Sequence, residues 1–94
     1  MAVFITRVEL HNADDNDYKV LHVGMKELNF SINIKDIATG KKYHLPTATY
    51  YSFGLENSED VVKLAKSAAS KTGRRFSIIS AKSTDVIWSG LDEA

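Results

Sequence analysis

The 94-residue chain contains no cysteine. A disulfide framework, a thiolate zinc site and a thiol nucleophile are therefore excluded, and the absence fits a reducing compartment. The chain also lacks a long apolar run, because its first apolar residues, Ala2 to Ile5, are followed by Thr6 and Arg7. That segment is too short for a signal peptide or a membrane span. We therefore expect a cytoplasmic protein with no membrane partner.

Glycine and histidine are sparse, which removes several kinds of site. The five glycines are dispersed, so the chain has no glycine-rich phosphate loop and no Gly-x-Ser-x-Gly elbow. The three histidines, His11, His22 and His44, share no metal-ligand spacing. The acidic cluster between Asp14 and Asp17 has the carboxylates that a Mg²⁺-dependent nuclease needs, but such residues also cap helices. We favour capping, and we expect no metal and no cofactor.

The net charge is zero, so the molecule as a whole has no general attraction for nucleic acid. The distribution is uneven, because the stretch from Val61 to Thr84 has basic side chains and no acidic one. Contacts with phosphates are one interpretation of this stretch. Solubilising cations and cations near a helix C-terminus are the other. The basic residues are Lys63, Lys66, Lys71, Arg74, Arg75 and Lys82.

Hydrophobic periodicity predicts four strands and two helices in the order βαββαβ, which is typical of the ferredoxin-like fold. We expect an α+β protein with a single domain over residues 1–94, a four-stranded antiparallel sheet of order 4-1-3-2 and both helices on one face. The first strand is apolar enough to be central, and Pro46 interrupts the third. The predicted strands are Val3–Leu10, Phe30–Lys35, a third that starts near Tyr43 and is regular over Thr47–Phe53, and Phe76–Ala81. The predicted helices are Tyr18–Leu28 and Val61–Ala69.

Local signals mark the helix ends. One of residues 14–16 caps the first helix, and Asn29 ends it in a left-handed conformation. Asn57 or Ser58 caps the second helix. Gly24 permits close packing of the first helix against the sheet. The predicted core is Phe4, Val8, Leu10, Leu21, Met25, Leu28, Ile32, Ile34, Leu64, Ala68 and Ile78.

The third predicted strand and the last residues bear on partners. The strand carries Tyr43, His44 and further aromatic residues up to Phe53, which suit base stacking on a sheet or a core or dimer interface. A two-layer fold leaves one sheet face bare, so we expect a homodimer. Residues 83–94 form a tail in which Val86–Trp88 is either an extra edge strand or a segment that reaches a second subunit.

Two motifs carry a family resemblance. The pattern Tyr18-x-x-Leu21-His22-x-x-Met25-x-x-Leu28-Asn29-Phe30-Ser31, followed by Gly40-Lys41-Lys42-Tyr43-His44-Leu45-Pro46, resembles the GhoS family of antitoxin endoribonucleases from type V toxin–antitoxin systems. The segment from Thr47 to Tyr51 is similar to uncharacterised bacterial and phage proteins grouped with that family. The resemblance covers roughly residues 3–91. It implies a ferredoxin-like fold, similar to small CRISPR-associated nucleases, and cleavage of a toxin messenger RNA.

In the family a basic residue on the first helix is linked to cleavage, and His22 stands at the matching position. We therefore expect metal-independent attack of a ribose 2′-OH on the neighbouring phosphate, with His22 or His44 moving protons. Arg7, Arg74 or Arg75 would stabilise the phosphorane charge. The expected RNA contacts are Lys42, Tyr43, Arg74 and Arg75. The alternative is a non-catalytic module of bacterial or phage origin that binds RNA or protein.

Overall fold

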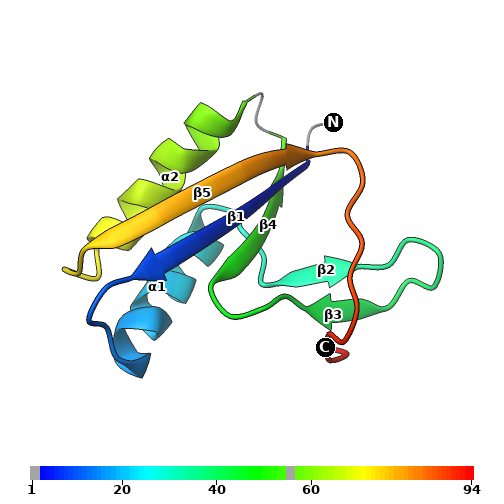
Figure 1. Cartoon of the computed structure of the whole chain (residues 1–94), viewed down its shortest axis with the longest axis horizontal. Helices are drawn as coiled ribbons and strands as arrows, with labels where there is room; N and C mark the ends of the chain where they lie inside the picture. Colours follow the sequence, from blue (N-terminus) through cyan, green and yellow to red (C-terminus); the bar gives the residue numbers. More distant parts are fainter. Residues whose placement is uncertain (1–2, 55–56) are drawn as a thin grey trace.

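The structure is a computed structural model that describes residues 3–54 and 57–94. It confirms an α+β architecture, with five antiparallel strands and two helices among these residues (Figure 1). The elements are β1 (Val3–Leu10), α1 (Asp15–Glu27), β2 (Asn33–Lys35), β3 (Lys42–His44), β4 (Thr49–Phe53), α2 (Ser58–Ser70) and β5 (Phe76–Ser83).

The main sheet has three strands in the order β4-β1-β5. β1 is central, as its apolar sequence predicts. Its alternate side chains Phe4, Thr6, Val8 and Leu10 are buried and point toward the helices, which lie together on this side of the sheet (Figure 1). Arg7 lies between them on the opposite, outer face, because successive strand residues point to opposite faces. The sheet thus has one covered face and one outer face.

The predicted four-stranded sheet is wrong for the described residues. β2 pairs with β3 in a separate two-stranded hairpin. The predicted interruption of the third strand at Pro46 is confirmed: β3 and β4 are separate, because Pro46 cannot donate a backbone hydrogen bond and Ala48 has a φ of 60°. Of the predicted second strand, only Ser31 pairs with the main sheet. It exchanges two backbone hydrogen bonds of 2.8 Å with Tyr51 on the outer edge of β4.

Most of the predicted core is confirmed. Phe4, Val8, Leu10, Leu21, Met25, Ile34 and Ala68 are buried, while Leu28, Leu64 and Ile78 are partly buried against the core. Ile32 was predicted wrongly, since 44% of it is exposed. The chain is not a strand at that point: it turns between the Ser31 bridge and β2, so the alternation does not continue. Phe30 and Tyr50 enter the core instead.

The helix signals are confirmed. Asp14 caps α1, and Asn57 caps α2 by accepting a hydrogen bond from the backbone of Asp60. Asn29 has a left-handed φ of 67°. The predicted partner of Gly24 is wrong, because Gly24 packs against α2 and not against the sheet: an added Cβ would lie 3.2 Å from the Cβ of Ala68.

The tail folds back on its own hairpin. Trp88 lies against Tyr43, with ring centroids 5.8 Å apart. The backbone N–H of His44 donates to Asp92, and that of Ala94 donates to Lys42. Val86–Trp88 is therefore not an extra edge strand, and the tail packs on this chain. The homodimer stays a prediction.

A candidate nucleic-acid interface beside His22

A groove of about 790 Å³ lies beside the C-terminal half of α1. Its other wall is the segment that leads from α1 into β2, together with the end of β4. The groove contains one cation, two carboxamides, one histidine and several apolar side chains. Its lining is His22, Val23, Lys26, Asn29, Phe30, Ser31, Ile32, Asn33 and Phe53. This mixture suits a ligand with flat apolar parts and a negative charge.

The end of α1 explains how the groove forms. Asn29 takes up the left-handed conformation directly after the helix, which turns the chain back toward the sheet. Phe30 then enters the core, and Ser31 is fixed by its bridge to Tyr51. The apolar side chains that remain outside the core therefore line an open depression. Among these, Phe53 is 58% exposed.

His22 is held at the groove by a buried tyrosine. Its Nδ1 lies 2.5 Å from the hydroxyl oxygen of Tyr50, a fully buried residue of β4. Desolvation lowers the pKa of His22, and desolvation with the nearby Tyr18 raises the pKa of Tyr50. At neutral pH His22 is therefore neutral and Tyr50 is protonated. When Tyr50 donates to Nδ1, the proton of the neutral ring is on Nε2.

The structure separates the three predicted catalytic residues. Arg7 is exposed on the outer face of β1, opposite the side on which His22 meets Tyr50. His44 is exposed on β3, in the hairpin. Of the three, only His22 lines the groove. The predicted catalytic set is thus not gathered in this site.

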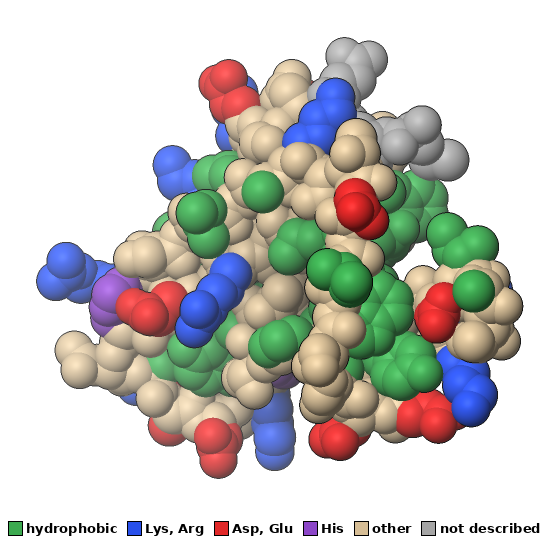
Figure 2. Space-filling view, turned by 45° about the vertical axis from the view of Figure 1, so that its right-hand side comes forward, with side chains coloured by type: hydrophobic (Ala, Val, Ile, Leu, Met, Phe, Trp, Pro, Cys, Tyr) green, Lys and Arg blue, Asp and Glu red, His purple; other side chains and the backbone are tan. Residues whose placement is uncertain are grey.

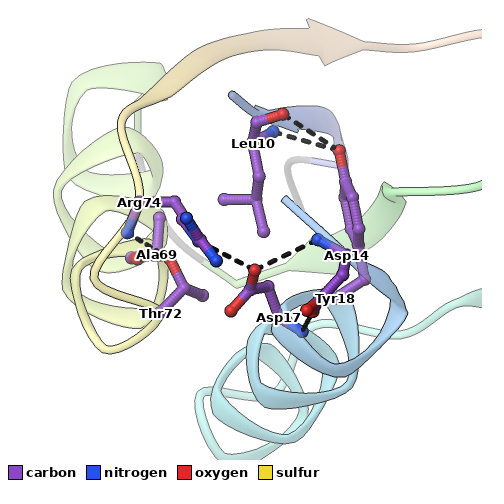
Figure 3. Close-up of polar contacts among 7 residues, drawn as sticks. All are labelled: Leu10, Asp14, Asp17, Tyr18, Ala69, Thr72 and Arg74. Carbon is purple, nitrogen blue, oxygen red and sulfur yellow. Dashed lines mark hydrogen bonds and ion pairs between the residues drawn. The ribbon is translucent and has the colours of Figure 1, made fainter. Parts of the chain in front are cut away.

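The predicted RNA contacts are also dispersed. Arg74 is engaged with Asp17, whose Oδ2 lies 2.9 Å from the arginine Nε (Figure 3). Tyr43 packs against Trp88, and Lys42 is exposed on the hairpin. Arg75 is exposed just before β5, on the main sheet. Figure 2 shows Lys and Arg side chains scattered over one face rather than gathered. The predicted set therefore forms no single basic patch.

The acidic cluster serves as a cap. Asp14 accepts from the backbone N–H of Asp17, and Asp17 accepts from that of Asp14 (Figure 3). The bond from Asp14, with Arg74 adding to it, lowers the pKa of Asp17. The described residues contain no group of three or more His, Asp or Glu side chains arranged to hold a metal ion.

Of the nine residues that line the groove, only His22 was predicted from the sequence as a site residue. Lys26 follows His22 by four positions on α1, a spacing that places both on one helix side and was a usable signal. Asn29, Asn33 and Phe53 come from three other segments, and only the turn after α1 and the Ser31 bridge bring them together. Asn33 also has a buried Oδ1 without a hydrogen-bond partner.

Comparison of the chain with models of protein families, with curated proteins and with solved structures finds no match. Within residues 3–54 and 57–94, no helix has the length and apolar character needed to cross a membrane.

Proposed function

We propose that this protein is an RNA-binding, endoribonuclease-like antitoxin that acts on a toxin mRNA in the cytoplasm. The observation that carries the proposal is a neutral, half-buried His22 on an open groove that also presents Lys26 and an exposed Phe53. The resemblance of the α1 segment to the GhoS family, in which this helix position is linked to cleavage, supports the same assignment.

The groove suits a single-stranded segment of RNA. An exposed aromatic ring such as Phe53 stacks on any base. The ammonium of Lys26 attracts a phosphate, and the carboxamide of Asn29 matches the donor and acceptor edges of bases. The proposed site therefore uses these residues in place of Lys42, Tyr43, Arg74 and Arg75.

The proposed reaction is attack of a ribose 2′-oxygen on the adjacent phosphorus. The 2′-O–P bond forms as the P–O5′ bond breaks, which leaves a 2′,3′-cyclic phosphate and a free 5′-hydroxyl. His22 accepts the 2′-OH proton at Nε2, which requires the tautomer that donates from Nδ1 to Tyr50. The 5′-oxygen takes a proton from water, and Lys26 offsets the phosphorane charge.

The sheet order supports a reduced ferredoxin-like fold as part of the proposal. β5, β1 and β4 take the places of the predicted strands 4, 1 and 3 in the order 4-1-3-2. Ser31 bridges β4 at the edge where the predicted strand 2 would lie. In this interpretation the second strand is reduced to one bridge because its residues pair with β3 instead.

A second function is a non-catalytic RNA- or protein-binding module. The hydrogen bond between His22 and Tyr50 favours it, because a protonated Tyr50 that donates to Nδ1 leaves Nε2–H as a donor rather than a base. Such a donor binds a phosphate or carbonyl oxygen without chemistry.

Binding and cleavage of a panel of single-stranded RNAs, with and without EDTA, test both functions. We expect His22→Ala to keep binding and to lose cleavage by at least about 100-fold. Lys26→Ala should weaken binding, while Lys63→Ala, an exposed lysine of α2 outside the groove, should not. Binding without cleavage by the parent would select the second function. No RNA binding at low salt would contradict the proposed function.

A further inference from the structure

β5 forms a long free edge of the main sheet. It has eight residues, and among the described residues it pairs only with β1. In Figure 1 no strand lies beyond it, and the tail that follows runs toward the hairpin on the other side of the molecule. A free strand edge presents unpaired backbone donors and acceptors.

The pairing pattern tells which groups are free. The backbone N–H of His11, which follows β1, donates to the carbonyl oxygen of Arg75, which precedes β5. The register then directs the backbone N–H and C=O groups of the odd-numbered residues of β5 toward β1. Backbone groups alternate between the two sides of a strand in an antiparallel sheet. Phe76, Ile78, Ser80 and Lys82 therefore direct their N–H and C=O groups away from the sheet.

β5 also lacks the usual protection of an edge. It contains no proline or glycine, and Lys82 is its only charged residue. On the outer face Ile79, near the middle of the strand, is 70% exposed. A β-branched residue that is exposed in mid-strand suits a cross-strand contact.

We propose that β5 pairs with β5 of a second copy, antiparallel, about a two-fold axis at Ile79. In this register Ile78 lies opposite Ser80 and Phe76 lies opposite Lys82, so all four outward-directed residues are paired. Ile79 meets its own copy in a non-hydrogen-bonded pair, where Cα atoms are about 4.5 Å apart. Ser77 lies opposite Ala81.

Three features favour a second copy as the occupant. The register pairs residues of the same sheet face, so the helices of both copies lie on one side. The single charge, Lys82, falls opposite Phe76 rather than opposite another charge. The assembly also closes, because the far edge of each sheet, β4, already carries the Ser31 bridge. A two-fold interface of this kind yields a dimer and not a filament.

Cysteine cross-linking tests the register, because the chain has no cysteine of its own. Under mild oxidation we expect Ile79→Cys to form a disulfide dimer at least about tenfold faster than Ile37→Cys, since the Cα separation of the proposed pair is compatible with a disulfide. Ile37 is a matched control because it is 95% exposed in the hairpin loop. Ser77→Cys and Ala81→Cys should cross-link efficiently only when mixed. Equal rates for positions 79 and 37 would overturn the proposal.

Charge exchange at the same position is an independent test. Ile79→Lys and Ile79→Glu should each sediment as monomers at concentrations where the parent is a dimer, and their mixture should dimerise, because residue 79 faces itself. Far-UV circular dichroism should show each variant folded, since Ile79 is exposed in the monomer. A parent that stays monomeric at millimolar concentration, or a Lys variant that dimerises like the parent, would refute the pairing.

Discussion

At the scale of single residues, the contact between His22 and Tyr50 has the clearest functional consequence. The imidazole of His22 is half-buried against the phenol of Tyr50, which is fully buried in the core. Protonation of His22 is therefore linked to folding. A sequence reader sees a histidine on a helix and a tyrosine on a strand, 28 positions apart. The contact between the two side chains sets their protonation states. It therefore decides whether His22 acts as a base or as a hydrogen-bond donor.

Removal of the Tyr50 hydroxyl should destabilise the protein. Tyr50→Phe keeps the buried ring but deprives Nδ1 of its partner, so we expect the free energy of unfolding to fall by about 1 kcal/mol. Urea denaturation measures the change. Tyr51→Phe is the matched control, because no hydrogen bond of its hydroxyl is found among the described residues. Equal effects of the two changes would argue against the contact.

The lowered pKa of His22 predicts a pH dependence of stability. The unfolded chain takes up a proton near the ordinary value of 6.5 while the folded chain does not, so acid favours unfolding. The contribution is complete above about pH 6.5 and is lost as the pH falls from there through the folded pKa. Denaturation between pH 7.5 and 5 should show a smaller loss of stability in His22→Gln than in the parent. Identical pH profiles would remove this role of His22.

At the scale of secondary-structure elements, close contact between α1 and α2 sets the helix layer. Gly24 on α1 and Ala68 on α2 leave no room for a larger side chain at their contact. The cap at Asp14 fixes where α1 begins, and Arg74 joins that cap to the loop after α2 (Figure 3). These contacts hold both helices over one sheet face, which leaves the groove at the far end of α1.

Enlargement of residue 24 should separate the helices. Gly24→Leu should lower the free energy of unfolding by about 1–3 kcal/mol, because the new side chain overpacks the contact with Ala68. Gly24→Ala should cost less, since the gain of about 1 kcal/mol in helix propensity offsets part of the crowding. Thermal denaturation ranks the variants. A Leu variant as stable as the parent would show that α1 and α2 can move apart freely.

Loss of the first cap should weaken α1. Asp14→Ala removes an acceptor for the Asp17 backbone and should cost about 1 kcal/mol. Asp15→Ala, in the same helical turn, makes no such bond and should change stability less. Chemical denaturation of both variants measures the difference, and a larger effect at position 15 would contradict the assigned cap.

At the scale of the whole molecule, two small sheets are joined mainly through one bridge. The main sheet carries the core, while the hairpin is covered by the tail through Trp88 and the last residues. A single bridge transmits little cooperativity, so the hairpin and tail are expected to open before the main sheet. The groove spans this junction, which makes its shape sensitive to that opening.

Trp88 is the only tryptophan and therefore reports on the tail. In urea, its fluorescence transition should precede the loss of far-UV circular dichroism, because the hairpin and tail unfold first. Coincident transitions would instead indicate one cooperative unit. Trp88→Ala should loosen the tail and leave the proposed β5 pairing unchanged, since the tail runs away from that edge (Figure 1).

Local patterns were sufficient for much of this molecule. The periods of two and 3.6 residues predicted the helices, the first and last strands and most of the core, because each period reports which face of an element is apolar. Caps within residues 14–16 and at Asn57 or Ser58 were also predicted, because capping involves residues only three positions apart, and the structure selects Asp14 and Asn57. The position of His22 on the first helix was likewise available from the chain.

Strand partners and the site needed the folded chain. Three features depend on contacts that a local pattern does not report: the pairing of β2 with β3, the packing of the tail on the hairpin, and the Ser31 bridge. The alternation of residues within one strand does not predict which strand it pairs with. The apolar alternation from Phe30 therefore predicted a regular second strand in the main sheet, where the chain makes only the Ser31 bridge before β2 pairs with β3. The groove follows from these long-range contacts: His22 was visible in the sequence, but Asn33 and Phe53 join it only when the turn after α1 meets the edge of β4.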